Sequence, residues 1–315
     1  MRLIILILLC MTVIISACSI PGLSGLSSGS SSVSGGSGIN MKFIDAPKNG
    51  EEIIGGDTFS IVLRVENGIP GKTGLTGTVC LRDSTTDTYG GIPSNTCRPV
   101  NLRAADITST GILSTFDELR FPEVGFYSYH NLDPLLSLDN QVYADFNYDI
   151  ETTSVGNICV SRPRSSSPSI PSGCGDTQSV SLTQPSGVPL VASVTVAKSR
   201  ITDDEIRLRF DIAIRNSGRG RILSPDSFIS AQSTDYPEVG FSAFVNQAPI
   251  SCTGVRSGSI ELRQEENERV IKCTSSITLD QDYIQVPFNL RLRYGYLDTV
   301  LGPRIKLIGE ENSLV

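Results

Sequence analysis

The sequence contains no tryptophan and a single histidine, His130. No two cysteines have the C-x₂-C spacing of zinc sites, and one histidine is a poor source of further metal ligands. No P-loop or dinucleotide-binding fingerprint occurs. The one G-x-S-x-G match, Gly25–Gly29, lies in a stretch of serine and glycine, without the strand and helix that flank a nucleophile elbow. Counting alone does not exclude a Ser-His-Asp site, but no motif frames one. We therefore expect no catalytic residues, no cofactor and no metal, with His130 in a loop or on the surface.

Basic residues are neither abundant nor clustered. The chain has 26 Lys and Arg against 33 Asp and Glu, for a net charge of −7. Binding to nucleic acid depends on cations that neutralise phosphates, so we expect no nucleic-acid partner. Hydrophobic residues make up 39% of the chain, which is enough to build a core and argues against global disorder.

The longest apolar run, Leu3–Ile15, is too short to cross a bilayer. It follows Arg2 and precedes small residues, as in a secretory signal. The site Ile15-Ser16-Ala17-Cys18 resembles the lipobox of prokaryotic lipoproteins, with an aliphatic residue, two small residues and a cysteine. The resemblance implies that residues 1–17 are removed and that Cys18 carries the lipid. Conventional cleavage near Ala17 and an uncleaved short anchor are the alternatives.

The cysteines fit this interpretation. Cys10 would leave with the signal and Cys18 would be lipidated, leaving an even number in the exported chain. Disulfides are the default for such a chain, and each close pair would add about 3 kcal/mol by loop closure. The predicted pairs are Cys80 with Cys97, Cys159 with Cys174, and Cys252 with Cys273.

Residues 18–39 hold the lipidated cysteine and a tether. Ser19–Gly38 is dominated by serine and glycine and has no charge, so it should be a flexible coil. A coil of this length has a mean reach of about 25 Å. We expect it to lift a folded body off the membrane.

The rest of the chain has the pattern of short strands. Thr58–Glu66 alternates, with Phe59, Ile61, Leu63 and Val65 on one face, and Gln141–Ile150, Glu205–Arg215 and Gln285–Tyr296 alternate similarly. No stretch has a sustained helical period with caps. These patterns predict an all-β protein with two tandem Ig-like β-sandwich domains. The domains are expected at 40–183 and 188–309, followed by a tail at 310–315.

Two breaks and a repeat are also predicted. We expect a turn at Ser154–Asn157 and a separate last strand at Pro303–Ile308. The segments IVLRVENG (Ile61–Gly68) and DIAIRNSG (Asp211–Gly218) match, as do the aromatic pairs Phe146/Tyr148 and Tyr294/Tyr296. The strand with its N-x-G turn resembles the CARDB-type Ig-like modules of prokaryotic surface proteins, and other Ig-like or fibronectin-like modules fit nearly as well. The segment PEVGF also occurs twice, at Pro122–Phe126 and Pro237–Phe241.

These features predict an exported protein held by its lipid on the extracytoplasmic face of a membrane, at the cell surface or in the periplasm. A non-catalytic role in adhesion, scaffolding or envelope-complex assembly, with a protein partner, fits best. One alternative is a module that binds carbohydrate, stacked on Tyr127/Tyr129 or Tyr294/Tyr296, or Ca²⁺. Another is a hydrolase with two carboxylates about 5–10 Å apart in a cleft. Candidate acids are Asp203, Asp204, Glu205, Asp280 and Asp282.

Overall fold

The structure is a computed structural model, and it describes residues 38–309 except 71–73, 86–88, 95, 134, 136, 163–173, 203, 228–235, 264–265 and 267. The predicted signal, Cys18, most of the tether and the tail at 310–315 lie outside the described residues. The described part is all-β, and it includes no helix. Within it, no helix is long and apolar enough to span a membrane.

The strands have the following bounds: β1 (Ile39–Asp45), β2 (Glu52–Ile54), β3 (Thr58–Phe59), β4 (Ile61–Asn67), β5 (Leu75–Asp83), β6 (Thr96–Leu102), β7 (Asp106–Thr108), β8 (Gly111–Leu113), β9 (Thr115–Phe121), β10 (Tyr127–Ser128), β11 (Ser137–Ser161), β12 (Thr177–Val180), β13 (Leu190–Arg200), β14 (Glu205–Asn216), β15 (Arg221–Leu223), β16 (Glu238–Val245), β17 (Ala248–Pro249), β18 (Ser251–Cys252), β19 (Ser259–Glu261), β20 (Glu268–Thr278) and β21 (Tyr283–Ile308).

The predicted inner faces are confirmed. In β4, Ile61, Leu63 and Val65 are fully buried, while the side chains between them are partly exposed. Strand β14 alternates in the same way from Ile206 to Ile214. The period of two that marks these segments in the sequence therefore records one packed and one solvated face.

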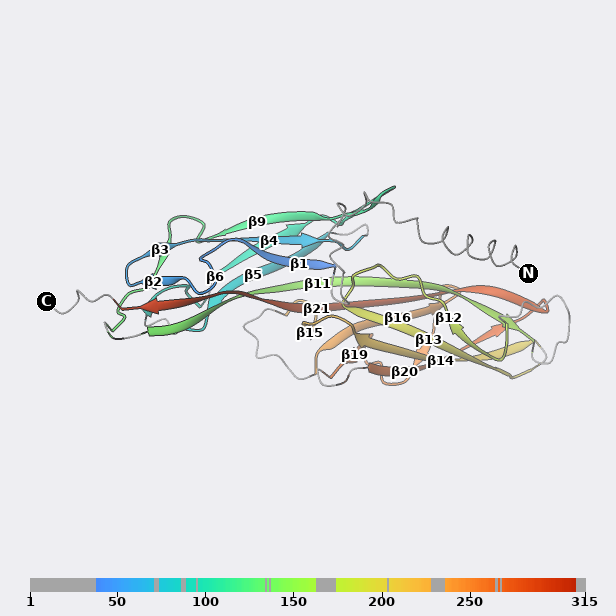
Figure 1. The fold of residues 1–315 in the computed structure, drawn as a ribbon. Helices are drawn as coiled ribbons and strands as arrows, with labels where there is room; N and C mark the ends of the chain where they lie inside the picture. The colour runs from blue at the N-terminus through green and yellow to red at the C-terminus, as the bar shows by residue number, and fades with distance from the viewer. Residues whose placement is uncertain are drawn as a thin grey trace, which may run out of the picture. The chain divides into compact units, whose positions relative to one another are not determined.

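Two long strands, β11 and β21, run antiparallel and pair from Ser137↔Ile308 to Ser161↔Tyr283 (Figure 1). The predicted turn at Ser154–Asn157 is therefore wrong, because these residues pair with Leu290–Pro287 of β21. The predicted break before Pro303 is wrong for the same reason, since β21 continues through it.

A glycine lies at or next to each of these places, Gly156 and Gly302, and each allows another segment to pack closely. A Cβ on Gly156 would lie 2.9 Å from the carbonyl oxygen of Ser181 and 2.7 Å from the side chain of Val180. A Cβ on Gly302 would lie 2.6 Å from the ring of Phe43. Glycine inside a strand often marks such a close approach.

The described strands form several sheets. Strands β1, β4 and β9 make a three-stranded sheet, and the order β12-β13-β14-β20-β18 makes a five-stranded sheet. A nine-stranded sheet includes β5, β6, β11, β16 and β21, so it draws strands from both halves of the chain. Phe210 of β14 stacks on Phe288 of β21 with ring centroids 5.7 Å apart, which packs the five-stranded sheet on the nine-stranded one. The predicted boundary between 183 and 188 stays a prediction.

The internal repeat has a structural counterpart. Asn67 and Asn216 end β4 and β14, and each side chain accepts a hydrogen bond from the backbone N–H two residues later, at 2.9 and 3.0 Å. These asparagines are 149 residues apart, as are Gly38 and Gly187, whose backbones are hydrogen-bonded to each other. Tyr148 and Tyr296, 148 residues apart, pair directly in the β11–β21 ladder. Because equivalent residues meet each other, the two halves are related by an approximate two-fold axis between them.

Strand pairing follows the same repeat. The ladders β1–β4–β9 and β13–β14–β20 are equivalent, and both β11 and β21 are the last long strand of their half. The halves differ in the segment that leads into the third strand of these ladders, which is β9 in the first half and β20 in the second. The first half inserts the β7–β8 hairpin there, whereas the second half connects β19 to β20 through residues 262–267.

The repeated PEVGF segment does not follow this symmetry. Pro122–Phe126 forms an exposed loop after β9, whereas Pro237–Phe241 leads into β16, where Val239 and Phe241 are buried. Equivalent positions after β20 hold a different sequence. The identity of the two pentapeptides therefore has no structural counterpart in the repeat.

The six cysteines of the body are joined as Cys80–Cys97, Cys159–Cys174 and Cys252–Cys273, with Cα–Cα distances of 4.0, 5.0 and 3.9 Å. The first and third disulfides link residues directly opposite each other in β5–β6 and β18–β20. Lys198 donates hydrogen bonds of 2.9 Å to the carbonyl oxygens of Cys159 and Cys174. Three disulfides indicate an oxidising, extracytoplasmic compartment.

Candidate functional site

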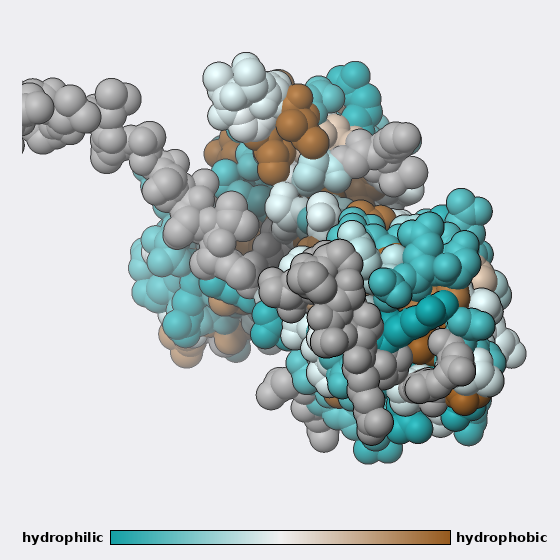
Figure 2. Space-filling model, turned by 90° about the vertical axis from the view of Figure 1, so that its right-hand side faces the viewer, coloured by the Kyte–Doolittle hydropathy of each residue, from teal (hydrophilic) through white to brown (hydrophobic). Residues whose placement is uncertain are grey.

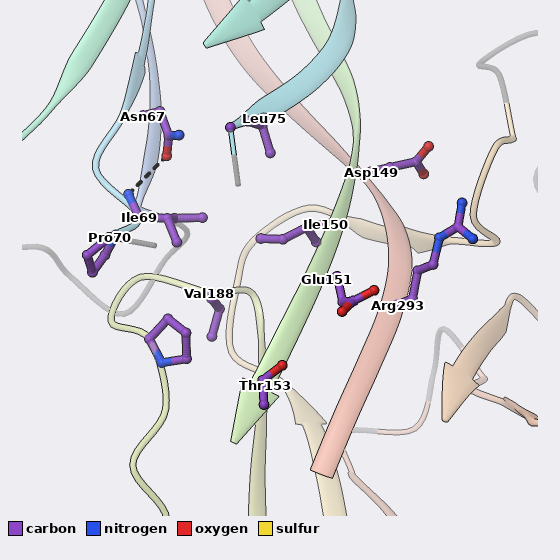
Figure 3. A pocket seen from close by; sticks show the side chains of 12 residues that line it. Asn67, Ile69, Pro70, Leu75, Asp149, Ile150, Glu151, Thr153, Val188 and Arg293 are labelled. Carbon is purple, nitrogen blue, oxygen red and sulfur yellow. Dashed lines mark hydrogen bonds between the residues drawn. The ribbon is translucent and has the colours of Figure 1, made fainter. Parts of the chain in front are cut away.

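A pocket of about 560 Å³ lies where the two halves meet, and we call it the junction pocket (Figure 3). One wall is apolar. It is formed by Ile69, Pro70, Leu75, Ile150, Pro185 and Val188. The volume is in the range of small-molecule sites.

The repeat explains why this wall forms here. The Asn67 side chain turns the chain after β4 by accepting from the N–H of Ile69 at 2.9 Å, and it donates to the carbonyl oxygen of Arg103 at 2.9 Å. The N–H of Ala105 donates to the carbonyl oxygen of Ile69 at 3.1 Å, and Ile69 and Pro70 line the pocket together with Leu75 of β5. In the second half, the hydroxyl of Tyr294 accepts from the N–H of Leu190 at 3.1 Å and fixes the start of β13 next to Val188. Burial raises the pKa of Tyr294, so the phenol stays protonated.

Charged residues of the pocket lie on the other side of β11. Asp149 and Glu151 alternate with Ile150, so their side chains share the face opposite the apolar wall, on the side of Arg293 (Figure 3). Arg293 pairs with Asp226 at 3.0 Å, and Arg291 pairs with Glu151 at 3.3 Å.

The pKa of Asp149 is raised above its usual value of 3.8, mainly by partial burial. The N–H of Asp226 donates to its carboxylate at 3.1 Å and lowers the pKa, while the charge of Asp226 raises it and that of Arg293 lowers it. Burial outweighs the hydrogen bond and the guanidinium.

Asp149 and Glu151 are the two carboxylates that line the junction pocket. Two residues apart on a strand, their Cα atoms are about 7 Å apart. However, Asp149 accepts from the backbone of Asp226 and Glu151 is paired with Arg291, and neither side chain faces the apolar wall. The pocket therefore does not direct two carboxylates at one bound substrate.

The acids singled out in the sequence do not converge either. Asp280 and Asp282 are exposed, and Asp204 pairs with Arg162 at 2.8 Å. Asp203 is outside the described residues. Among the residues with described positions, no group of three or more His, Cys, Asp or Glu could hold a metal ion.

The structure also tests the predictions for the tyrosine pairs and for His130. Tyr127, Tyr129, Tyr294 and Tyr296 are all buried, so none of these four rings forms a carbohydrate-stacking surface. His130 is exposed, and its backbone N–H donates to the backbone carbonyl oxygen of Tyr89 at 2.8 Å, which confirms the expected loop position.

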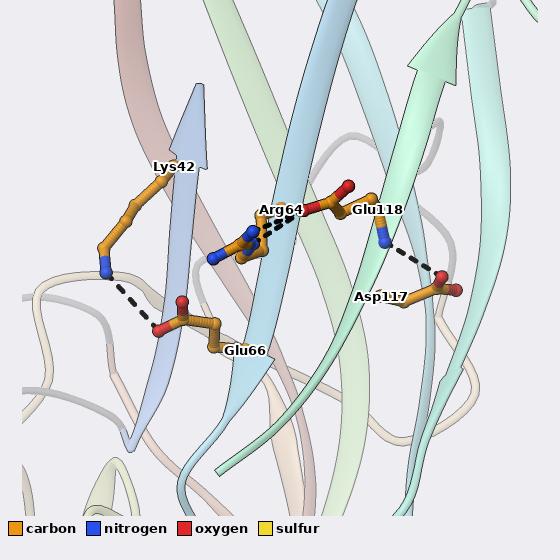
Figure 4. A network of polar contacts seen from close by, with 5 residues as sticks. All are labelled: Lys42, Arg64, Glu66, Asp117 and Glu118. Atoms are coloured by element: carbon orange, nitrogen blue, oxygen red, sulfur yellow. Dashed lines mark hydrogen bonds and ion pairs between the residues drawn. The ribbon is translucent and has the colours of Figure 1, made fainter. Parts of the chain in front are cut away.

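The outer face of the β1–β4–β9 sheet is highly charged (Figure 4). Lys42 pairs with Glu66 at 3.5 Å, and Arg64 donates to Glu118 at 2.9 Å. Arg64 also lies over the ring of Phe116, 4.6 Å from its centroid. These paired charges make a solvated face, not a site with an unsatisfied charge.

Comparison with protein-family models, with curated proteins and with solved structures finds no match for this chain.

Sequence reasoning missed both the junction pocket and the exposed apolar residues of the β7–β8 hairpin. The pocket combines residues from segments more than 100 positions apart. The sequence does contain a weak pattern that predicts the hairpin, because Ile107 and Ile112 lie on either side of the polar run Thr108–Thr110.

Proposed function

We propose that this protein is an extracytoplasmic lipoprotein, anchored in a membrane through Cys18, whose β-body has a non-catalytic role in adhesion, scaffolding or envelope-complex assembly. The observation that carries the proposal is that all six cysteines of the body are joined to one another. Once the predicted signal is removed, Cys18 is the one cysteine left for a lipid.

We also propose that the body consists of two tandem Ig-like sandwiches, 40–183 and 188–309, that share β11 and β21. The equivalent ladders β1–β4–β9 and β13–β14–β20 support this proposal, as do the matching turns at Asn67 and Asn216. An experimental structure in which either half lacked two facing sheets would contradict it.

A binding role for the body rests on two kinds of surface. The junction pocket could accept a small ligand such as a saccharide, because its wall is apolar and hydrogen-bonding groups stand at its rim. Sheet edges such as β6 could pair with a strand of a protein partner. Ca²⁺ is the less supported ligand, since the acids of the pocket are already paired.

The test of the anchor is the intact mass of protein extracted from membranes of a producing prokaryotic cell. We expect a chain that starts at Cys18 and carries a diacylglyceryl group, and we expect the Cys18→Ala variant to be released from the membrane fraction. A mass without lipid, or an unchanged membrane fraction for the variant, would contradict the proposal. Saccharide or Ca²⁺ binding that perturbs Ile150 and Val188 in NMR spectra would favour the ligand-binding alternative.

A further inference from the structure

The β7–β8 hairpin exposes apolar side chains on a two-stranded element. Ile107 is 78% exposed, Leu113 61% and Ile112 47%, and Phe116 at the start of β9 is 58% exposed. Ile107 and Ile112 are directly opposite each other, so they form one aliphatic face. Figure 2 shows hydrophobic atoms, in brown, exposed at the top of the molecule. The segment that leads into β9 lies at the same height in Figure 1, because the two views differ only by a turn about the vertical axis.

The sandwich does not need this hairpin. Twelve residues, 103–114, lie between β6 and β9, whereas the second half connects the equivalent strands, β19 and β20, through the six residues 262–267. An isolated two-stranded hairpin is only marginally stable in water, and exposed apolar groups on it add nothing to the core. An apolar cluster placed on an insertion therefore points to a surface that is covered when the protein acts.

The hairpin lies beside the point where the body is tethered. Gly38, the first described residue, accepts a hydrogen bond from the N–H of Gly68 at 2.5 Å. Next to it, Asn67 pairs with both Ile39 and Thr115, the first residue of β9. Two strand spacings, about 10 Å, thus separate the start of the body from the base of the hairpin.

We propose that the β7–β8 hairpin is a second membrane contact, which inserts its aliphatic face between lipid headgroups and fixes the orientation of the anchored body. The inference rests on the proposed lipid at Cys18 only for its location. The tether predicted from the sequence, Ser19–Gly38, is 20 residues long, and a flexible chain of that length has a mean reach of about 25 Å, which would hold the hairpin near the bilayer. Tethering raises the local concentration of the bilayer, so weak partitioning is sufficient.

The chemistry of the hairpin fits lipid. Its eight residues carry one charge, Asp106 at the base, and its tip is formed by the hydroxyl side chains Thr108, Ser109 and Thr110. The Thr108 hydroxyl already donates to the carbonyl oxygen of Gly111 at 2.9 Å, which reduces the number of polar groups that insertion would leave unpaired. The neighbouring outer face of β1–β4–β9 is charged, so contact with lipid is limited to the hairpin.

The first experiment measures sedimentation with phosphatidylcholine vesicles, using the full mature chain with Cys18→Ser so that no acyl chain contributes. We expect measurable partitioning at millimolar lipid, reduced at least tenfold by Ile107→Ser with Ile112→Ser, which removes both residues of the aliphatic face. The matched control is Val124→Ser with Phe126→Ser at the far end of β9, where the exposed fractions are 88% and 62%. This control should partition within twofold of the parent.

The second experiment uses the absence of tryptophan from the chain. Ile112→Trp in the Cys18→Ser chain places a single fluorophore on the hairpin. We expect its emission to shift to the blue with vesicles and to be quenched by brominated lipid, whereas Phe126→Trp should show neither change.

Three results would overturn the inference: no partitioning of the parent, equal loss in the hairpin and control variants, or an unchanged Ile112→Trp emission. Loss of self-association or of a protein partner in the hairpin variant, with vesicle binding intact, would also overturn it and assign the face to protein docking. Because these measurements use unlipidated protein, they are independent of the mass test for Cys18.

Discussion

The shared strands β11 and β21 predict that damage to the core of one half destabilises the other half equally. Leu63 of β4 is fully buried and is paired with Phe43 on one side and Leu119 on the other. Leu63→Ala removes three methylene-sized groups from this core and leaves a cavity, which costs about 2–5 kcal/mol. Each 1.4 kcal/mol is a factor of ten in the population of the unfolded state, so that population should rise about 30-fold to several thousand-fold.

If each half completes its core with both long strands, the first half cannot unfold alone without stripping the ladder of the second. Peptides covering β14 should then exchange amide hydrogen faster by the same factor as peptides covering β4, with the disulfides oxidised. The reciprocal change, Ile212→Ala in β14, should accelerate exchange in β4. A control at the exposed Val270, Val270→Ala, should stay within about 0.5 kcal/mol of the parent.

Hydrogen-exchange mass spectrometry measures both peptides in one sample. The reasoning is refuted if Leu63→Ala accelerates exchange in β4 and leaves β14 unchanged, or if calorimetry of the variant resolves two separate transitions. Either result would mean that the β11–β21 ladder does not couple the halves.

Two further predictions concern the junction. Tyr294→Phe removes the acceptor of the buried Leu190 N–H, so urea unfolding should show that the unfolding free energy falls by about 1–3 kcal/mol. The control Tyr143→Phe, at a half-exposed ring, should change it little. Equal urea midpoints for the parent and both variants would contradict the assigned hydrogen bond. The raised pKa of Asp149 contributes stability that is present in full below pH 3.8 and is lost as the pH rises through the folded-state pKa. The unfolding free energy of the parent minus that of Asp149→Asn should therefore be larger at pH 3 than at pH 7, and a difference that is flat or grows with pH would contradict the burial effect.

The sequence predicted the strands with a clear period of two and the local cysteine pairs. Ile61, Leu63 and Val65 alternate with polar residues, so burial of one face follows directly. Each cysteine pair is close in the chain, so proximity required no knowledge of the topology.

The sequence did not predict the length of β11 and β21. Gly156 and Gly302 resemble turn residues, but their role depends on Val180 and Phe43, which approach from other strands. A period of two cannot distinguish a glycine that ends a strand from one that admits a neighbour. The junction pocket was missed for a related reason, since Ile69 and Val188 meet only through the two-fold relation of the halves.

The repeat itself was visible, and its geometric meaning was not. The matching Asn67 and Asn216 segments indicate duplication, and the asparagines form the same turn. That Gly38 bonds to Gly187 and Tyr148 pairs with Tyr296 shows that the copies face each other across an axis. Nothing in a linear repeat specifies this arrangement.

The pairing of β11 with β21 also sets an order for biogenesis. A chain synthesised from its N-terminus delivers Tyr148 long before its partner Tyr296, 148 residues later. Until then, one side of β11 has no strand to pair with, and that edge is a template for unwanted association. Contacts of such sequence separation slow folding, because the loop must close before the pairing compensates for it. The first half can therefore finish folding only after β21, the last strand that the structure describes, is free to pair, which makes the arrival of residues 283–308 the step that completes both halves at once.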